Sequence, residues 1–177
     1  YAFFTLYASL DEVDLRQDVP LTERPEIDRW ALALLHHTVD EATSALEAYD
    51  AHKAGQAIEG LVDQLSNWYI RRNRRRFWKS DAGSDKQSAY LTLYQCLDTL
   101  HRLLAPFMPF IAEEMYQNLV RSRDPGAPLS VHMTQWPQAQ PDWSDTALLE
   151  ATRVVQNIVA LGRSARESSQ IRVRQPL

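Results

Sequence analysis

The 177-residue sequence contains only one cysteine and five glycines, and it lacks a long hydrophobic run. A single cysteine excludes a disulfide-stabilised scaffold and a zinc site built from several cysteines. No apolar stretch reaches the roughly 18 residues that a membrane-spanning helix requires, so we expect no membrane partner. Glycine-rich phosphate loops and the GxSxG, HExxH and CxxC motifs are also missing. The sequence therefore predicts no catalytic residue and no metal site within this chain.

Alternating β-branched residues are nearly absent as well, and several long stretches show helical periodicity instead. Proline and aspartate mark the boundaries of these stretches, since Pro25 stands at the start of one and Asp50 directly before another. Pro106 and Pro109 interrupt a third. We expect an all-α bundle with short connections, which favour antiparallel neighbours. The expected helices span residues 25–49, 51–79, 88–105, 109–122 and 146–168.

The net charge of −4 conceals a segregated pattern. Residues 1–63 hold thirteen acidic and four basic side chains, whereas residues 68–79 (WYIRRNRRRFWK) hold six basic and no acidic ones. Residues 153–177 contain five arginines and one glutamate. Because solvated helix faces usually alternate the sign of their charges, an uninterrupted arginine run indicates an external polyanion.

A regular helical wheel, with 3.6 residues per turn, places part of the arginine run on the apolar seam of helix 51–79. That seam runs through Ile58, Leu61 and Leu65 and leads directly to Arg72, Arg75 and Arg76. An unpaired charge cannot be buried without a large penalty. We therefore expect Arg72 and Arg76 to be structural residues that pair with acids, for which Glu113 and Glu114 are available. In the alternative interpretation, the helix leaves the bundle and presents its guanidinium groups to a polyphosphate.

Several segments resemble the isoleucyl-tRNA synthetases, which are class I ligases. LSNWYIRRNRRRFW (65–78) is similar to a signature helix of that family, and LAPFMPFIAEEMYQNL (104–119) is similar to its LAPFxPFxxExxYQNL stretch. Further matches occur in the same order along the chain: YAFFTLYA (1–8), EIDRWALALL (26–35), SVHMTQWP (130–137), LGRSAR (161–166) and IRVRQPL (171–177). The valyl and leucyl enzymes share the bundle, but the RRRFW ending favours the isoleucyl branch.

The resemblance implies that this chain is the helical anticodon-binding domain, which positions tRNA for a catalytic core located elsewhere. The intact enzyme would couple isoleucine to its tRNA in the cytoplasm, with ATP and magnesium bound in the catalytic core and zinc only in other missing parts. Residues 1–9 would end a helix that leaves the core, residues 24–123 would form the bundle, and residues 124–177 would lead to a C-terminal extension. Because Tyr1 is not an initiator methionine, we also expect the chain to be a piece of a longer protein.

The partners implied are the isoleucine-accepting tRNA and the remainder of the synthetase chain. Phosphate contacts fix the register of a bound nucleic acid, and the exposed basic residues are the candidates for these contacts. The candidate tRNA-binding residues are Arg71, Arg74, Arg75 and Lys79 in the first basic run, and Arg163, Arg166, Arg172 and Arg174 in the second. Two other functions stay open: a protein-interaction bundle that binds an acidic partner, and DNA binding, although no helix-turn-helix spacing is evident.

Overall fold

The computed structural model of the chain describes residues 1–11, 14–15, 18–78 and 83–172. The chain divides into two compact units, Tyr1–Ser144 and Asp145–Leu177. The described residues form helices and turns without a β-strand, which confirms the all-α prediction. In this division the proline-rich segment between residue 124 and the last helix belongs to the first unit.

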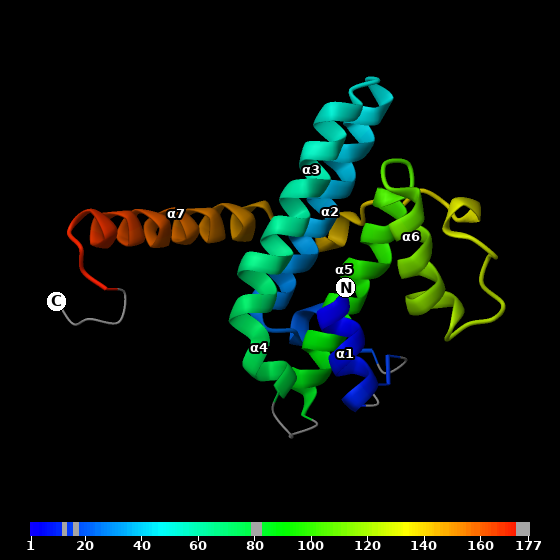
Figure 1. Ribbon diagram of the computed structural model, residues 1–177, viewed down its shortest axis with the longest axis horizontal. Helices are drawn as coiled ribbons and strands as arrows, with labels where there is room; N and C mark the ends of the chain where they lie inside the picture. Colours follow the sequence, from blue (N-terminus) through cyan, green and yellow to red (C-terminus); the bar gives the residue numbers. More distant parts are fainter. Residues whose placement is uncertain (12–13, 16–17, 79–82, 173–177) are drawn as a thin grey trace. The chain divides into compact units, whose positions relative to one another are not determined.

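Two long helices, α2 (Glu26–Glu47) and α3 (Ala51–Gln64), lie side by side as an antiparallel pair (Figure 1). Helix α2 follows Pro25, whose fixed φ suits the start of a helix. Asp50 begins α3, because its side chain accepts a hydrogen bond of 2.9 Å from the Lys53 amide. The tight connection between the two helices places Tyr49 at a φ of 60°, a left-handed conformation that non-glycine residues rarely adopt.

Helix α5 (Ser84–Leu104) packs against α2 and supplies much of the core of the first unit. Its buried residues include Tyr90, Leu93 and Leu103. The Tyr90 ring meets the Phe77 ring edge-on at 5.0 Å, in the geometry that aromatic pairs prefer. Cys96 is fully buried on the same helix, where burial, together with the nearby charge of Asp28, raises the pKa of its thiol to about 12.

The remaining elements of the first unit cover the sides of this core. Helix α1 (Ala2–Asp11) buries Phe4 and Ala8, while α6 (Pro109–Tyr116) follows the prolines that end α5. A short π-helical segment, η3 (Gln117–Arg121), extends α6. Three 3₁₀ turns complete the unit: η1 (Leu21–Glu23), η4 (Val131–Met133) and η5 (Pro141–Trp143).

In the described part of the second unit, residues 145–172, one long helix, α7 (Thr146–Ser168), is followed by a short turn. Asp145 begins it by accepting a hydrogen bond of 2.9 Å from the Leu148 amide. No residue of α7 is buried, and apolar side chains such as Ile158 and Leu161 are largely exposed.

Candidate RNA-binding surface

The arginine run occupies a separate helix, α4 (Arg71–Trp78), that continues α3 through a six-residue π-helical segment, η2 (Leu65–Ile70). A π-helical turn accommodates one residue more than an α-helical turn, because its hydrogen bonds join residues i and i+5. Each residue after such a segment therefore takes the place that its predecessor would have had, which is a rotation of about 100°. Asn73 and Phe77 consequently lie on the buried face of α4.

This rotation overturns part of the helical-wheel prediction. Arg72 and Arg75 were expected on the apolar seam, but both side chains are exposed. Arg71 and Arg74 are also exposed, as expected. Of the arginines in this run, only Arg76 is partly buried, with 14% of its side chain accessible. The π-helical segment thus turns Arg72 and Arg75 out of the seam, and four of the five arginines in the run are exposed.

The inward-facing guanidinium of Arg76 binds a fully buried carboxylate, Asp28 of α2. Arg76 Nη1 lies 2.7 Å from Asp28 Oδ1, and Arg76 Nη2 lies 2.8 Å from Oδ2, so the contact is bidentate. A second acid, Asp85, forms an ion pair in which its Oδ1 lies 2.9 Å from Arg76 Nη2, and its backbone carbonyl accepts a hydrogen bond of 2.8 Å from the same nitrogen. Burial alone would lower the pKa of Arg76, but the hydrogen bonds and charge of Asp28 raise it instead. Arg76 therefore keeps its charge and anchors α4 to the bundle.

Asp28 also accepts hydrogen bonds from two further segments of the first unit. The Tyr69 hydroxyl of η2 donates to Oδ1 at 2.7 Å, and the Ser88 hydroxyl of α5 donates to Oδ2 at 2.6 Å. Burial and the adjacent charge of Asp28 raise the pKa of Tyr69 well above its usual value. We call Asp28 with its donors Tyr69, Arg76 and Ser88 the Asp28 cluster. It ties α2, η2, α4 and α5 together at one buried point.

The acids that we expected to pair with the arginines have other roles. Glu113 accepts from the Ser130 hydroxyl at 2.8 Å and from the Val131 amide at 3.0 Å, so it holds the η4 turn against α6. Glu114 is exposed and accepts from Asn118 one helical turn away. The prediction that these glutamates pair with Arg72 and Arg76 is therefore wrong. Asp28 and Asp85 take that role for Arg76, and Arg72 contacts an aromatic ring.

Sequence reasoning missed the Asp28 cluster, although a signal for it was present. Asp28 stands three, four and seven residues before Ala31, Leu32 and Leu35, which are all buried. These spacings place an acidic residue on the apolar face of an amphipathic helix. A buried carboxylate requires a charged or hydrogen-bonding partner, so this position alone predicts an arginine or several hydroxyl donors nearby.

The outward-facing guanidinium groups form the candidate RNA-binding surface, which we define as Arg71, Arg72, Arg74 and Arg75. Within the described parts of the chain, none of the four forms an ion pair with an acid. Arg72 instead lies over the ring of Trp68, with its Cζ atom 4.7 Å from the ring centroid. The candidate Lys79 falls outside the described residues. Four exposed cations on two turns of helix are suited to contacts with phosphate oxygens.

The second predicted basic group lies at the end of α7, in the second unit. Arg163 and Arg172 are exposed, whereas Arg166 Nη1 donates to the Arg172 carbonyl at 3.0 Å and closes the C-terminal turn. Arg174 falls outside the described residues. The side chains of this group are presented by a helix without buried residues, in contrast to the anchored helix α4.

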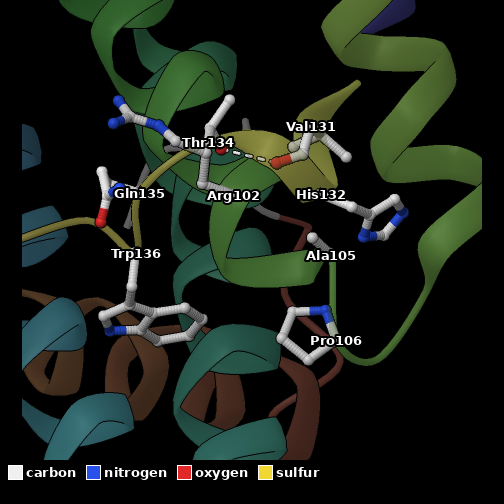
Figure 2. A pocket seen from close by; sticks show the side chains of 8 residues that line it. All are labelled: Arg102, Ala105, Pro106, Val131, His132, Thr134, Gln135 and Trp136. Atoms are coloured by element: carbon white, nitrogen blue, oxygen red, sulfur yellow. Dashed lines mark hydrogen bonds between the residues drawn. The ribbon is translucent and has the colours of Figure 1, made fainter. Parts of the chain in front are cut away.

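A cavity of about 360 Å³ lies between the end of α5 and the segment 131–136 (Figure 2). Several polar groups on its wall already have protein partners. The Trp136 indole donates to Thr43 at 2.8 Å, the Thr134 hydroxyl donates to the Val131 carbonyl, and the Arg102 guanidinium binds Asp98. These groups are therefore already engaged within the protein, and the exposed arginines of α4 remain the stronger candidate for a binding site.

Metal-binding and membrane-spanning features are absent from the residues that the structure describes. They contain no group of three or more histidine, cysteine, aspartate or glutamate side chains placed to hold a metal ion. No helix among them is long and apolar enough to cross a membrane. The main chemical capacity of the described surface is therefore its concentration of exposed guanidinium groups.

Comparison with known proteins identifies the family of this chain. A family model described as the anticodon-binding domain of tRNA ligase matches residues 28–177. The chain belongs to this family of anticodon-binding domains. It is also 50% identical over 177 residues to an isoleucine–tRNA ligase of Dehalococcoides mccartyi and 47% identical over 178 residues to one of Thermus thermophilus. Both alignments cover all of this chain but only 18% and 17% of the relatives, so it spans less than a fifth of their length.

Proposed function

We propose that this domain binds the isoleucine-accepting tRNA as part of an isoleucine–tRNA ligase, with the phosphate backbone held by the exposed arginines of α4. The observation that carries the proposal is a row of exposed guanidinium groups, without acidic partners among the described residues, on a helix that Arg76 anchors through the Asp28 cluster. Anchoring matters because a side chain on a fixed helix loses less freedom on binding. The family membership and the isoleucine–tRNA ligase relatives support the choice of tRNA.

In this proposal the domain positions tRNA and the chemistry takes place elsewhere in the ligase. Holding a substrate in a defined orientation turns the encounter with a distant active site into a proximity effect. In the same proposal, ATP and magnesium would bind in the catalytic core of the ligase, and any zinc in other parts of it. We infer a cytoplasmic location from the same function.

The proposal is tested by titrating the 177-residue chain into fluorescently labelled isoleucine tRNA at several salt concentrations. We expect Arg71→Ala/Arg74→Ala to weaken binding and to reduce the slope of log K against log [salt] by about one for each phosphate that the variant no longer neutralises. The matched control is Lys53→Ala/Arg123→Ala, which removes two exposed charges at other places in the first unit. Its affinity should stay close to that of the unmodified chain.

Equal affinities for the two double variants would show that α4 is not the binding surface. A titration with a non-cognate tRNA tests the specificity, and equal binding of both tRNAs would contradict recognition of the isoleucine tRNA by this domain. Displacement of the tRNA by an acidic polypeptide at equal charge concentration would favour the protein-interaction alternative instead.

A further inference from the structure

Arg72 differs from its neighbours because an aromatic ring supports it. Arg71, Arg74 and Arg75 are exposed without an aromatic partner among the described residues, while the Arg72 guanidinium lies over Trp68 at 4.7 Å. The two residues are one turn apart, and Trp68 itself lies in the π-helical segment that ends at Ile70. This segment moves Arg72 out of the seam and leaves Trp68 half-buried below it. The platform is therefore a consequence of the same rotation that exposes Arg75.

The chemistry of the pair indicates what it can bind. A guanidinium group is planar, and it stacks on aromatic faces while its edge keeps five N–H donors. The Arg72 guanidinium lies over the Trp68 ring, yet Arg72 is an exposed residue, so part of this cation remains open to solvent. Nucleobases in single-stranded RNA stack on arginine planes and on aromatic rings. Binding of a phosphate requires only hydrogen-bond donors. The contact of the Arg72 guanidinium with the Trp68 ring is therefore not needed for phosphate binding.

We propose that Trp68 and Arg72 form a stacking platform for an unpaired nucleobase of the bound RNA, next to the phosphate contacts of Arg71, Arg74 and Arg75. This proposal rests on the proposed function, because it assumes that α4 faces RNA. The arginines around the platform hold the backbone, and the platform holds one base that is splayed out of a loop. Stacking tolerates any base, so the platform supplies affinity and a preference for single-stranded RNA rather than a sequence code.

The test compares two lysine substitutions against two RNA probes. Arg72→Lys keeps the charge but removes the planar group, and Arg75→Lys makes the same change at an exposed position without a ring. The probes are an RNA hairpin with a single-stranded loop and the same hairpin with every loop nucleotide made abasic. Both probes carry the same phosphates, so they differ only in the bases that a platform could stack.

We expect Arg72→Lys to weaken binding of the intact hairpin by about fivefold or more, the lower limit for stacking one base on a side chain. Its affinity for the abasic hairpin should match that of the unmodified chain, and its salt slope should not change. Arg75→Lys alters a proposed phosphate contact, so any loss that it causes should be the same for the intact and the abasic hairpin. Trp68→Leu provides a second variant: provided that its thermal unfolding is cooperative, it should reproduce the Arg72→Lys effect on the intact hairpin.

If Arg72→Lys lost the same affinity for the intact and the abasic hairpin, the platform would be overturned and Arg72 would be assigned to a phosphate contact. The proposed function would stand in that case. An Arg72→Lys variant that binds both probes normally would overturn the platform as well. If the unmodified chain binds neither hairpin nor the isoleucine tRNA, the platform and the proposed function both fail.

Discussion

The two basic regions carry arginines on helices, yet the structure treats them differently. In α4 the helix is fixed by buried Asn73 and Phe77 and by the ion pair between Arg76 and Asp28. In α7 no residue is buried, and apolar side chains are exposed beside Arg163. The two regions are similar in net charge. Of the two helices, α4 is the one that buried side chains and a buried ion pair fix in place. A run of arginines on a helix can therefore form a surface of fixed orientation when one arginine of the run pairs with a buried acid.

The largest expected effect comes from a change to the Asp28 cluster. Asp28→Asn removes the charge that faces Arg76, and breaking a buried pair from one side typically destabilises a protein by about 3–5 kcal/mol. We expect a loss of this size in the free energy of unfolding, measured by urea denaturation with tryptophan fluorescence. The signal comes from the first unit, where all five tryptophans lie.

The control for this change is Glu150→Gln in α7, which removes one partner of the exposed ion pair with Arg153. Its urea midpoint should not move, because exposed ion pairs contribute little to stability. Similar midpoint shifts for the two variants would show that the Asp28 cluster does not anchor the first unit.

The second prediction compares the two basic regions as RNA-binding surfaces. Arg71→Ala/Arg74→Ala should weaken isoleucine tRNA binding more than Arg163→Ala/Arg172→Ala does, because the ion pair between Arg76 and Asp28 fixes the helix that carries Arg71 and Arg74. Fluorescence anisotropy at constant salt measures both affinities. A larger loss for the α7 pair would reverse the comparison and make the second unit the main RNA-binding region.

Most of the fold could be predicted from the sequence because its boundaries are chemical. Pro25 and Asp50 begin helices as expected, and the prolines after Leu104 separate α5 from α6. These residues act locally, through a fixed φ, a side-chain acceptor or a missing amide. The hydrophobic periodicity between them was enough to predict an all-α bundle.

The orientation of the arginines could not be predicted in the same way. The π-helical hydrogen bonds of η2 have no hydrophobic pattern of their own in the sequence. A regular helical wheel therefore placed Arg72 and Arg75 on the apolar seam. The partner of Arg76 was also beyond a local argument. Asp28 lies 48 residues away on another helix, and sequence alone did not rank it above Glu113 or Glu114.

A milder change to the Asp28 cluster gives the third prediction. Tyr69→Phe removes one donor but leaves the charge pair of Asp28 and Arg76 intact. Hydrogen bonds to charged groups contribute about 1.5–3 kcal/mol, and neutral ones about 0.5–1.5 kcal/mol. Tyr116→Phe is the matched control, since its hydroxyl donates to the neutral Pro128 carbonyl at 2.7 Å. Urea denaturation should show the larger loss for Tyr69→Phe, and the opposite order would mean that the buried charge adds nothing to this bond.

The smallest expected effect contrasts a carboxylate of each unit in acid. In the first unit, burial raises the pKa of Glu113, but hydrogen bonds from Gln117, Ser130 and Val131 outweigh it and lower the pKa below its usual value. In α7, the hydrogen bond from Arg153 lowers the pKa of Glu150. A carboxyl group whose pKa is lower in the folded state stabilises the fold above its unfolded pKa, near 4.5, and this contribution is lost as pH falls through the folded pKa.

The contributions of the two carboxylates to stability should depend differently on salt concentration. The hydrogen-bond donors to Glu113 are neutral, whereas Glu150 pairs with a cation. High salt screens an exposed ion pair but leaves neutral hydrogen bonds almost unchanged. We expect Glu113→Gln to lower the urea midpoint at pH 7 in both low and high salt, with the difference from the unmodified chain shrinking below pH 4.5. Glu150→Gln should show at most a small difference, confined to low salt. A Glu113→Gln effect that disappears in high salt would mean that long-range charge, rather than the hydrogen bonds to η4, holds this carboxylate.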